Sequence, residues 1–341
     1  MASSGHTVRE IAKVAGVSIS TVSRALNSSV PVSNTARKKI EAAILFLNNS
    51  SASSPGKSRS VGIIMPESSA NNLKEHPLLY SIVSGFEDYL APFGVEPRVL
   101  NYSKLSDEIN ELLLAPMDGY FVIGTSAEDD MVILEAMQKK QSPWIVMNRH
   151  LEHENVSYVS LDDEYASESA VRYLIELGHR RIAFVGGGRD YQNTARRYRG
   201  YETALQNAGI PLRKEYIFFG QYSELSGYQM GKELLLLRQL PTAAFFASDT
   251  LAIGCMRYLT DHGIQIPRDI AVFGFGNIDK GEFSVPTLST VDQRYTDTGI
   301  IAAKALLQLM DTPSIAYERI LVKTRLVIRE SSGGAVNRFK K

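Results

Sequence analysis

Residues 7–27 read TVREIAKVAGVSISTVSRALN, and this stretch constrains the fold more than any other part of the chain. Its first half repeats apolar residues at i, i+3, i+4 and i+7, which is the spacing of one buried helical face. These residues are Val8, Ile11, Ala12 and Ala15. The same half begins with the T-x-x-E pattern of a capping box, so we expect a helix to start here.

A sharp turn and a second short helix follow. Gly16 stands where a chain turns after a helix, and Ser18 can cap the helix that comes next. We expect Val22 and Leu26 to face inward on that helix. Helix, glycine turn and helix together form a helix-turn-helix, whose second helix enters the major groove of DNA.

The outward positions of the second helix carry short polar groups and one guanidinium. They are Ser20, Ser23, Arg24 and Asn27. Such groups suit base edges and phosphates. An ordinary helical hairpin is the alternative, but it does not require polar residues at these spacings.

Charge supports a polyanion at one end of the molecule. The whole chain has 37 basic and 37 acidic residues, whereas residues 1–60 hold eight Lys or Arg and only two acids. A basic head on an acidic body favours nucleic acid as the partner of the head. A third helix follows the hairpin, with Ser33 as its expected cap and Ile40, Ala43, Ile44 and Leu47 on its inner face.

The head resembles the DNA-binding domain of the LacI/GalR family of bacterial repressors. The residues that carry this resemblance are the run Ala15-Gly16-Val17-Ser18, the run Thr21-Val22-Ser23-Arg24, then Asn27, Val32, Ser33 and Arg37. The resemblance implies a homodimer that binds a palindromic operator on double-stranded DNA. We expect the DNA contacts at Thr7, Ser18, Ile19, Ser20, Thr21, Ser23, Arg24, Asn27 and Ser33.

The remainder of the chain alternates short apolar runs with amphipathic helices, which predicts parallel sheets. Two such series and several crossovers resemble the two-lobe, periplasmic-binding-protein-like core of the same family. We therefore expect a head at 1–49, a serine-rich linker at 50–60 and a tail at 331–341. The first lobe would comprise 61–160 and 293–322, and the second 161–292 and 323–330. Family members carry a Tyr-x-Pro-Asn signature and a hinge helix in the linker, and this chain lacks that signature.

Ligands of such a core bind at the carboxyl ends of the strands, between the lobes. Polar residues that follow predicted strands are Thr125, Asn148, Arg149, Arg196 or Arg197, Asp249 and Asn277. The resemblance selects Arg197 as the arginine that bonds sugar hydroxyls, with Asp249 as an acid that also reaches the sugar. It adds Asn148, Asn277, the aromatic Tyr295, and His76 and Tyr80 from the opposite wall, where Leu79 is expected in the core. Asp249 could equally cap a helix.

The family resemblance favours a sugar effector, with galactose or a β-galactoside closest in pattern. A nucleobase- or sugar-phosphate-responsive regulator of the same fold is the alternative, and a cytoplasmic solute-binding protein is a more distant one. No phosphate-loop, dinucleotide or nucleophile-elbow motif occurs, so an enzyme is not expected. We expect no cofactor, no metal site and no membrane partner.

The single cysteine, Cys255, cannot form an intrachain disulfide, and the N-terminus has no hydrophobic signal region. Both features indicate a cytoplasmic protein.

Overall fold

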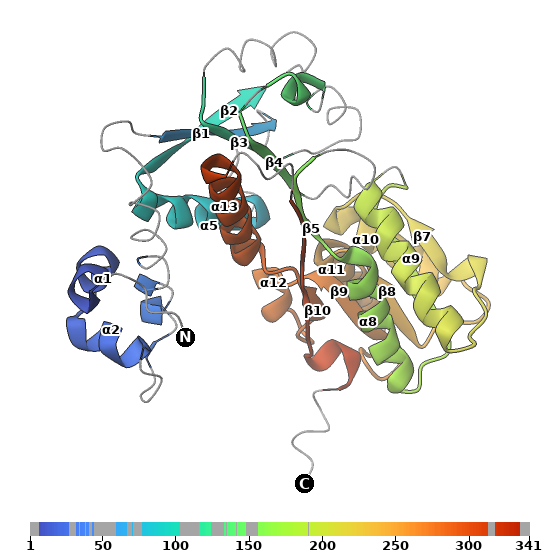
Figure 1. The fold of residues 1–341 in the computed structure, drawn as a ribbon. Coiled ribbons are helices and arrows are strands. Elements are labelled where there is room, and N and C mark those ends of the chain that lie inside the picture. Colours follow the sequence, from blue (N-terminus) through green and yellow to red (C-terminus); the bar gives the residue numbers. More distant parts are fainter. Residues whose placement is uncertain are drawn as a thin grey trace.

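The structure is a computed structural model. It describes residues 7–26, 32–33, 35–37, 39–40, 43, 59–66, 70, 77–102, 116–123, 133, 135–140, 142–147, 156–189, 191–312 and 318–334. A helical head lies beside two α/β lobes that are stacked end to end (Figure 1). The expected fold class, an all-α helix-turn-helix head and a two-lobe α/β core, is confirmed.

The head contains helices α1 (Val8–Ala15) and α2 (Ile19–Leu26), joined at Gly16 with a φ of +61°. That left-handed conformation explains why glycine stands at the turn. A third helical segment supplies Ile40 and Ala43 to the buried core of the head. Residues Ile11, Ala12, Ala15 and Val22 complete that core.

The first lobe is built on a six-stranded sheet in the order β11-β5-β4-β3-β1-β2, parallel throughout. Its strands are β1 (Arg59–Pro66), β2 (Val95–Tyr102), β3 (Gly119–Ile123), β4 (Trp144–Met147), β5 (Tyr158–Leu161) and β11 (Arg319–Val322). Helices α5 (Pro77–Leu90) and α13 (Tyr295–Asp311) cover one face, and a short turn η2 (Ala91–Phe93) follows α5. Strands covered on both faces are almost wholly apolar, as Val61–Pro66 are here.

The second lobe has a six-stranded sheet in the order β12-β10-β9-β8-β6-β7, with only β12 antiparallel to its neighbour among the described pairs. Its strands are β6 (Ile182–Gly186), β7 (Ile217–Phe219), β8 (Ala243–Phe246), β9 (Ala271–Gly276), β10 (Ser289–Asp292) and β12 (Arg325–Val327). Its helices are α8 (Asp163–Glu176), α9 (Gln192–Asn207), α10 (Glu224–Leu235), α11 (Asp249–Asp261) and α12 (Asp279–Glu282), with short turns η3 (Lys214–Tyr216) and η4 (Glu330–Ser332). Helices α8 and α9 pack on one face of the sheet, and α10 and α11 pack on the other.

The chain passes between the two sheets three times, after β5, after β10 and after β11. The domain boundaries drawn from the sequence stay a prediction. The sequence places most described strands and helices correctly, within a few residues at their ends, from Val61–Met65 to the last helix at Tyr295–Met310. The apolar spacing also predicts a helix at 107–113, and these residues lie outside the described part of the chain.

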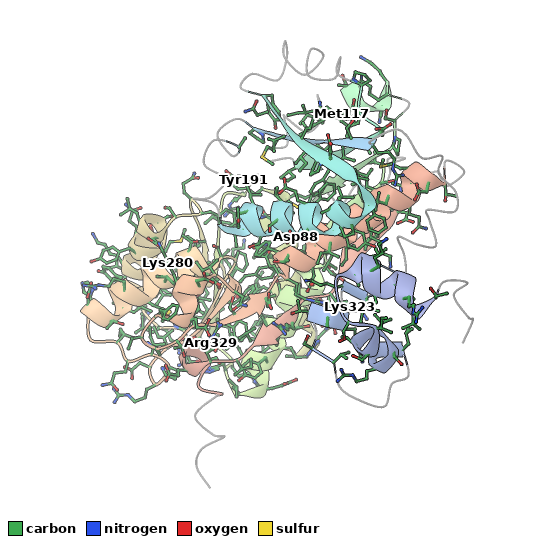
Figure 2. All side chains as sticks on the ribbon, turned by 90° about the vertical axis from the view of Figure 1, so that its left-hand side faces the viewer. Asp88, Met117, Tyr191, Lys280, Lys323 and Arg329 are labelled. Carbon is green, nitrogen blue, oxygen red and sulfur yellow. The ribbon has the colours of Figure 1, made fainter. Side chains whose placement is uncertain are left out.

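Helices α5 and α13 pack closely because a glycine on each removes the side chain at the crossing. A Cβ on Gly85 would meet the backbone carbonyl of Thr296, and a Cβ on Gly299 would meet that of Ile82. The head lies against the same helix pair in Figure 2, near Asp88 on α5. In the described part of the chain, no helix is long and apolar enough to cross a membrane.

Candidate DNA-binding head and effector cleft

Ser18 organises the start of the second head helix. Its Oγ accepts a hydrogen bond from the backbone N–H of Thr21 at 3.1 Å, which is the N-cap predicted from the sequence. It also lies 2.8 Å from the Oγ of Ser20 and 2.7 Å from Oγ1 of Thr21. These bonds fix three short polar side chains at the first turn of α2, the end of a recognition helix that meets base edges.

Arg24 is exposed on the same helix and folds back toward its first turn. Its Nε donates to the backbone carbonyl of Ser20 at 3.1 Å, and its Nη2 lies 3.5 Å from the Ser20 Oγ. Both of these described contacts lie within the helix, and an exposed guanidinium can exchange them for a base or a phosphate. Ser23 is half-buried and Ile19 is 50% exposed on the same helix.

The inward face of α2 differs from the expectation at one position. Val22 is fully buried, whereas Leu26 is 42% exposed, so the expectation that both face inward was wrong for Leu26. The core of the head closes over Val22 with Ile40 and Ala43, and Leu26 lies one turn beyond it.

The remaining predicted DNA contacts lie around this helix. Ser33 caps the third helical segment, because its Oγ accepts from the backbone N–H of Ala36 at 3.2 Å. Thr7 is exposed directly before α1, and Asn27 lies outside the described residues.

Between the two lobes lies a cavity of about 320 Å³, which we call the effector cavity. Its volume falls at the lower end of the range for small-molecule sites. The lining residues are Leu78, Leu79, Ile82, Asn193, Arg197, Tyr222, Ser248, Thr250, Phe275, Gly276, Ile278, Gln293 and Tyr295. The polar part of this lining comes from the ends of second-lobe strands and the helices that follow them, whereas α5 supplies an apolar wall.

Arg197 is the central polar group of the effector cavity. It is only 5% exposed, and its Nε donates to the Asp163 carboxylate at 2.7 Å. Its Nη1 donates to the backbone carbonyl of Ala247 at 2.6 Å, and its guanidinium carbon lies 3.8 Å from the ring centre of Phe275. Burial alone would lower the pKa of Arg197, but the neighbouring Asp163 carboxylate raises it, so the guanidinium stays charged. A planar cation fixed in this way presents its remaining N–H groups in one direction.

Two tyrosines and a glutamine join Arg197 in the lining. Burial raises the pKa of Tyr295 and of Tyr222, so both phenols remain protonated and can donate. The Tyr222 hydroxyl lies 2.6 Å from Oγ1 of Thr194, and Tyr295 is bonded to the nearly buried Gln293. These groups can orient a ligand with several oxygen atoms.

Asp249 lies behind the cavity and does not line it. The carboxylate is 1% exposed; one oxygen accepts from the Thr290 hydroxyl at 2.5 Å and the other from the Ile278 backbone N–H at 3.0 Å. Burial raises the pKa of Asp249 to about 6. Asp249 is the first residue of α11, and the N-cap is Ser248, whose Oγ accepts from the backbone N–H of Thr250 at 3.2 Å. In this structure Asp249 therefore positions the loop at 276–278, two of whose residues line the cavity.

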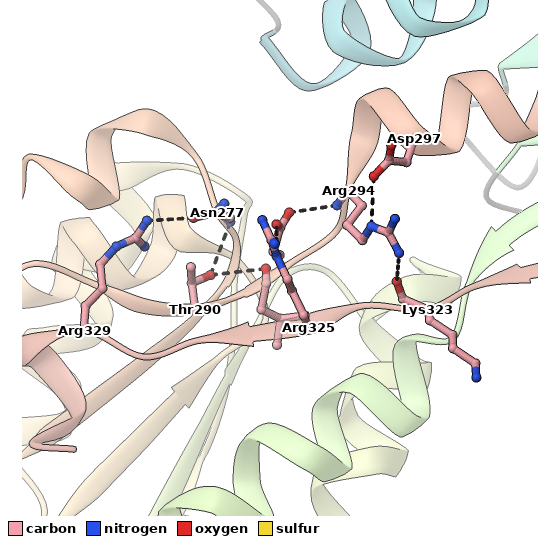
Figure 3. Close-up of polar contacts among 9 residues, drawn as sticks. Asn277, Thr290, Arg294, Asp297, Lys323, Arg325 and Arg329 are labelled. Atoms are coloured by element: carbon pink, nitrogen blue, oxygen red, sulfur yellow. Dashed lines mark hydrogen bonds and ion pairs between the residues drawn. The ribbon is translucent and has the colours of Figure 1, made fainter. Parts of the chain in front are cut away.

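Asn277 belongs to the same polar network. Its side-chain oxygen accepts from Nη2 of Arg329 at 2.9 Å, and its backbone N–H donates to Thr290 Oγ1 at 3.3 Å (Figure 3). Its φ of +56° is left-handed, a conformation that Asn tolerates better than most residues. Asn277, like Asp249, does not line the effector cavity.

Two family models match the chain. Residues 7–49 match the model for bacterial regulatory proteins of the lacI family, and residues 171–332 match a periplasmic binding protein-like domain. The probable HTH-type transcriptional repressor ExuR of Bacillus subtilis is 32% identical over 332 residues, which cover 95% of this chain and 98% of the relative. The chain belongs to the lacI family of bacterial regulatory proteins. It is a DNA-binding transcriptional repressor with a ligand-binding domain, and not an enzyme.

Three further regulators are similar to most of this chain. Catabolite control protein A of Priestia megaterium is 29% identical over 337 residues, covering 96% of this chain and 99% of the relative. The solved complex of the transcriptional regulator CelR with cellobiose is 27% identical, with a TM-score of 0.73 and coverage of 96% and 99%. A LacI family regulator from Enterococcus faecium with bound ribose is 28% identical, with a TM-score of 0.69 and coverage of 80% and 98%.

The structure brings only part of the predicted effector site together. Arg197 and Tyr295 line the cavity, whereas Tyr80 is 49% exposed and does not. His76, Thr125 and Asn148 lie outside the described residues. Leu79, expected in the core, both packs against the first-lobe core and lines the cavity.

Sequence reasoning missed several polar residues of the lining. They are Asn193, Tyr222, Ser248, Thr250 and Gln293. Because ligands of such folds bind at the carboxyl ends of strands, the segment after β8 was expected to contribute to the site. Ser248 of this segment lines the cavity, whereas the residue predicted from the sequence is the next one, Asp249. Tyr222 follows β7 without any motif, so no local signal could have identified it.

Proposed function

We propose that this repressor acts as a homodimer and that a small sugar bound in the effector cavity sets its affinity for operator DNA. The observation that carries the proposal is the fixed, buried Arg197 in a cavity bounded by both lobes. A ligand that contacts both walls favours one arrangement of the lobes, and a repressor with two heads responds to how those heads are held.

A physical connection between cavity and head supports this coupling. A second cavity, the head cavity, lies between the head and the first lobe and is lined by residues of both. Helix α5 supplies Leu79 to the effector cavity and Tyr89 to the head cavity, and α13 supplies Tyr295 to the former and Ile300 to the latter. Since these two helices cross in close contact, a shift at the effector cavity reaches the head through them.

The chemistry of the relatives supports a sugar as the ligand class. The solved regulators described with cellobiose and with ribose share the fold of this chain. The sequence pattern favours galactose and β-galactosides. We therefore test these sugars as effectors within a wider panel of monosaccharides and disaccharides.

A nucleobase is a second candidate effector. Two tyrosines, Tyr222 and Tyr295, line the cavity, and aromatic rings can stack on a flat base. Purines and pyrimidines therefore form a separate arm of the same panel.

The test begins with an operator selected from random DNA, whose affinity for the dimer is measured by fluorescence anisotropy with and without each ligand. By linkage, a true effector changes operator affinity by the same factor as operator changes effector affinity. A ligand that binds the cavity without changing operator affinity contradicts the proposed regulation. If a purine changes operator affinity and no sugar does, the effector is a nucleobase and not a sugar.

The head is tested with Arg24→Ala on the selected operator and on random DNA. If Arg24 contacts a base, the variant loses about 1–3 kcal/mol of specific binding and little of nonspecific binding. Arg257→Ala is the matched control, because Arg257 is exposed on α11, far along the chain from the head. Equal losses on both DNAs would show that Arg24 contacts only phosphate.

A further inference from the structure

The described lining of the effector cavity contains a buried cation and no carboxylate. Arg197 contributes the cation, and neither its partner Asp163 nor the buried Asp249 appears in the lining. Gly276 also lines the cavity and offers no side-chain acceptor. A neutral sugar donates its hydroxyl hydrogens to protein acceptors, so a cavity without a carboxylate offers it fewer strong acceptors.

Donors, by contrast, are abundant. A guanidinium has five N–H donors, and the described residues accept from two of those of Arg197, through Nε and Nη1. The other three have no partner among the residues that the structure describes. Arg197 is nearly buried and lines the cavity, so a ligand oxygen in the cavity is placed to accept from these N–H groups.

Four described helices also begin at the cavity. Leu78 and Leu79 lie in the first turn of α5, Asn193 in that of α9, Thr250 in that of α11 and Tyr295 in that of α13. Each of these helices has 13 or more residues, and the amino end of a helix carries a partial positive charge. Asp163 pairs with Arg197 itself, and Asp249 and Asp297 stand in the first turns of α11 and α13. Helices α5 and α9 have no acid in their first turns, so their amino ends keep their positive character.

We infer that the effector is an anionic sugar, one that carries a carboxylate or a phosphate, held by Arg197 and the amino ends of the helices around the cavity. This inference rests on the proposed function, because it names the ligand class of the same site. The anionic group lies at the second-lobe side, beside Arg197 and Ser248. The apolar ring face of the sugar packs on Leu78, Leu79 and Ile82 of α5.

The first experiment uses matched pairs of ligands on the full-length protein. Galactose is compared with galacturonate, and glucose with glucose 6-phosphate, by calorimetric titration at low and high salt. We expect the charged member of at least one pair to bind tenfold or more tightly than its neutral partner, with an advantage that shrinks as salt rises. The pair that shows the advantage distinguishes a carboxylate from a phosphate.

The second experiment places a carboxylate in the cavity without disturbing the helix. Ser248→Asp keeps a good N-cap for α11 and adds a negative charge to the lining, and Ser248→Asn has the same size and capping ability without the charge. We expect the Asp variant to bind the anionic sugar at least tenfold more weakly than the Asn variant. Thermal unfolding of both variants confirms that the fold is retained.

The outcomes separate this inference from the proposed function. Neutral sugars that bind as tightly as their charged partners overturn the anionic effector and leave the sugar-responsive repressor standing. Equal binding of the anionic sugar to the Asp and Asn variants also overturns the inference, because the group then lies away from Ser248. Binding of no sugar of either kind overturns both.

Discussion

The two lobes share one strand order yet contribute different chemistry to the effector cavity. Both sheets place their first strand between the second and third and recruit a late strand to the opposite edge, β11 in one lobe and β12 in the other. The second lobe supplies Arg197 and the other described polar side chains of the lining, except Gln293 and Tyr295, which follow β10. The first lobe supplies apolar residues of α5.

This difference indicates a division of labour within a duplicated architecture. The polar groups of the second lobe are fixed in advance by ion pairs and hydrogen bonds, as the bonds of Arg197 to Asp163 and Ala247 show. Preorganised polar groups select the ligand, whereas an apolar wall adds contact area with little directional preference. Because α5 and α13 also border the head cavity, the proposed regulation assigns to the first lobe the transmission from ligand to head.

The largest effect is expected from replacing Arg197. Arg197→Met removes the cation and leaves the Asp163 carboxylate buried without its partner, so the free energy of unfolding should fall by about 3–5 kcal/mol. Urea denaturation measures this loss. The double variant Arg197→Met with Asp163→Asn removes the uncompensated charge as well and should recover part of it.

Effector binding should be lost in both of these variants, since neither retains the guanidinium. A double variant that is stable and still binds the effector would show that Asp163 and Arg197 serve only the fold. The second lobe would then not bind the ligand through Arg197, and the contrast between a polar and an apolar lobe would lose its functional meaning.

A smaller effect is expected from the acid behind the cavity. Burial raises the pKa of Asp249 to about 6 from an ordinary 3.8, so between these values the native protein binds more protons than the unfolded chain. Stability contributed by this group is therefore present at low pH and lost as pH rises toward 6 and above. A shift of two pKa units corresponds to about 3 kcal/mol, so we expect the free energy of unfolding to change by on the order of 2–3 kcal/mol across this pH range.

Asp249→Asn isolates that contribution, because the amide does not titrate. Between pH 7 and pH 4, the wild type should gain this stability relative to the variant. Urea denaturation at several pH values measures the difference. A constant difference across this range would mean that Asp249 stays charged and that the loop at 276–278 is held without any cost of burial.

The sequence predicts the elements and much of the topology because their signals are local. Periodic apolar residues, the cap at Ser18 and the glycine turn at Gly16 are read from neighbouring residues, and the structure confirms each of them. Leu26 is the exception, because it has the apolar spacing of an inward residue but lies one turn beyond the described core of the head.

The site is less predictable because it is assembled by packing between distant segments. Tyr222 and Gln293 reach the cavity from separate elements that no motif connects. Asp249 stands at a strand end, as the rule requires, but its neighbour Thr290 across the sheet holds the carboxylate away from the cavity. Only three-dimensional contacts decide which of two adjacent polar residues, Ser248 or Asp249, lines the cavity.

The smallest effect is expected at the apolar wall. Leu79→Ala removes contact area without removing a hydrogen bond, so effector affinity should fall by about 1 kcal/mol, roughly fivefold. Leu236→Ala is the matched control, because Leu236 is 77% exposed on the second lobe and does not line the cavity. Calorimetric titration of both variants measures the change, and urea denaturation corrects for the packing that Leu79 also makes with the first-lobe core. A loss at Leu79 as large as that of Arg197→Met would place the main binding contacts on the first lobe. The two lobes would then contribute equally to ligand binding. The second lobe would no longer be distinguished as the one that selects the ligand.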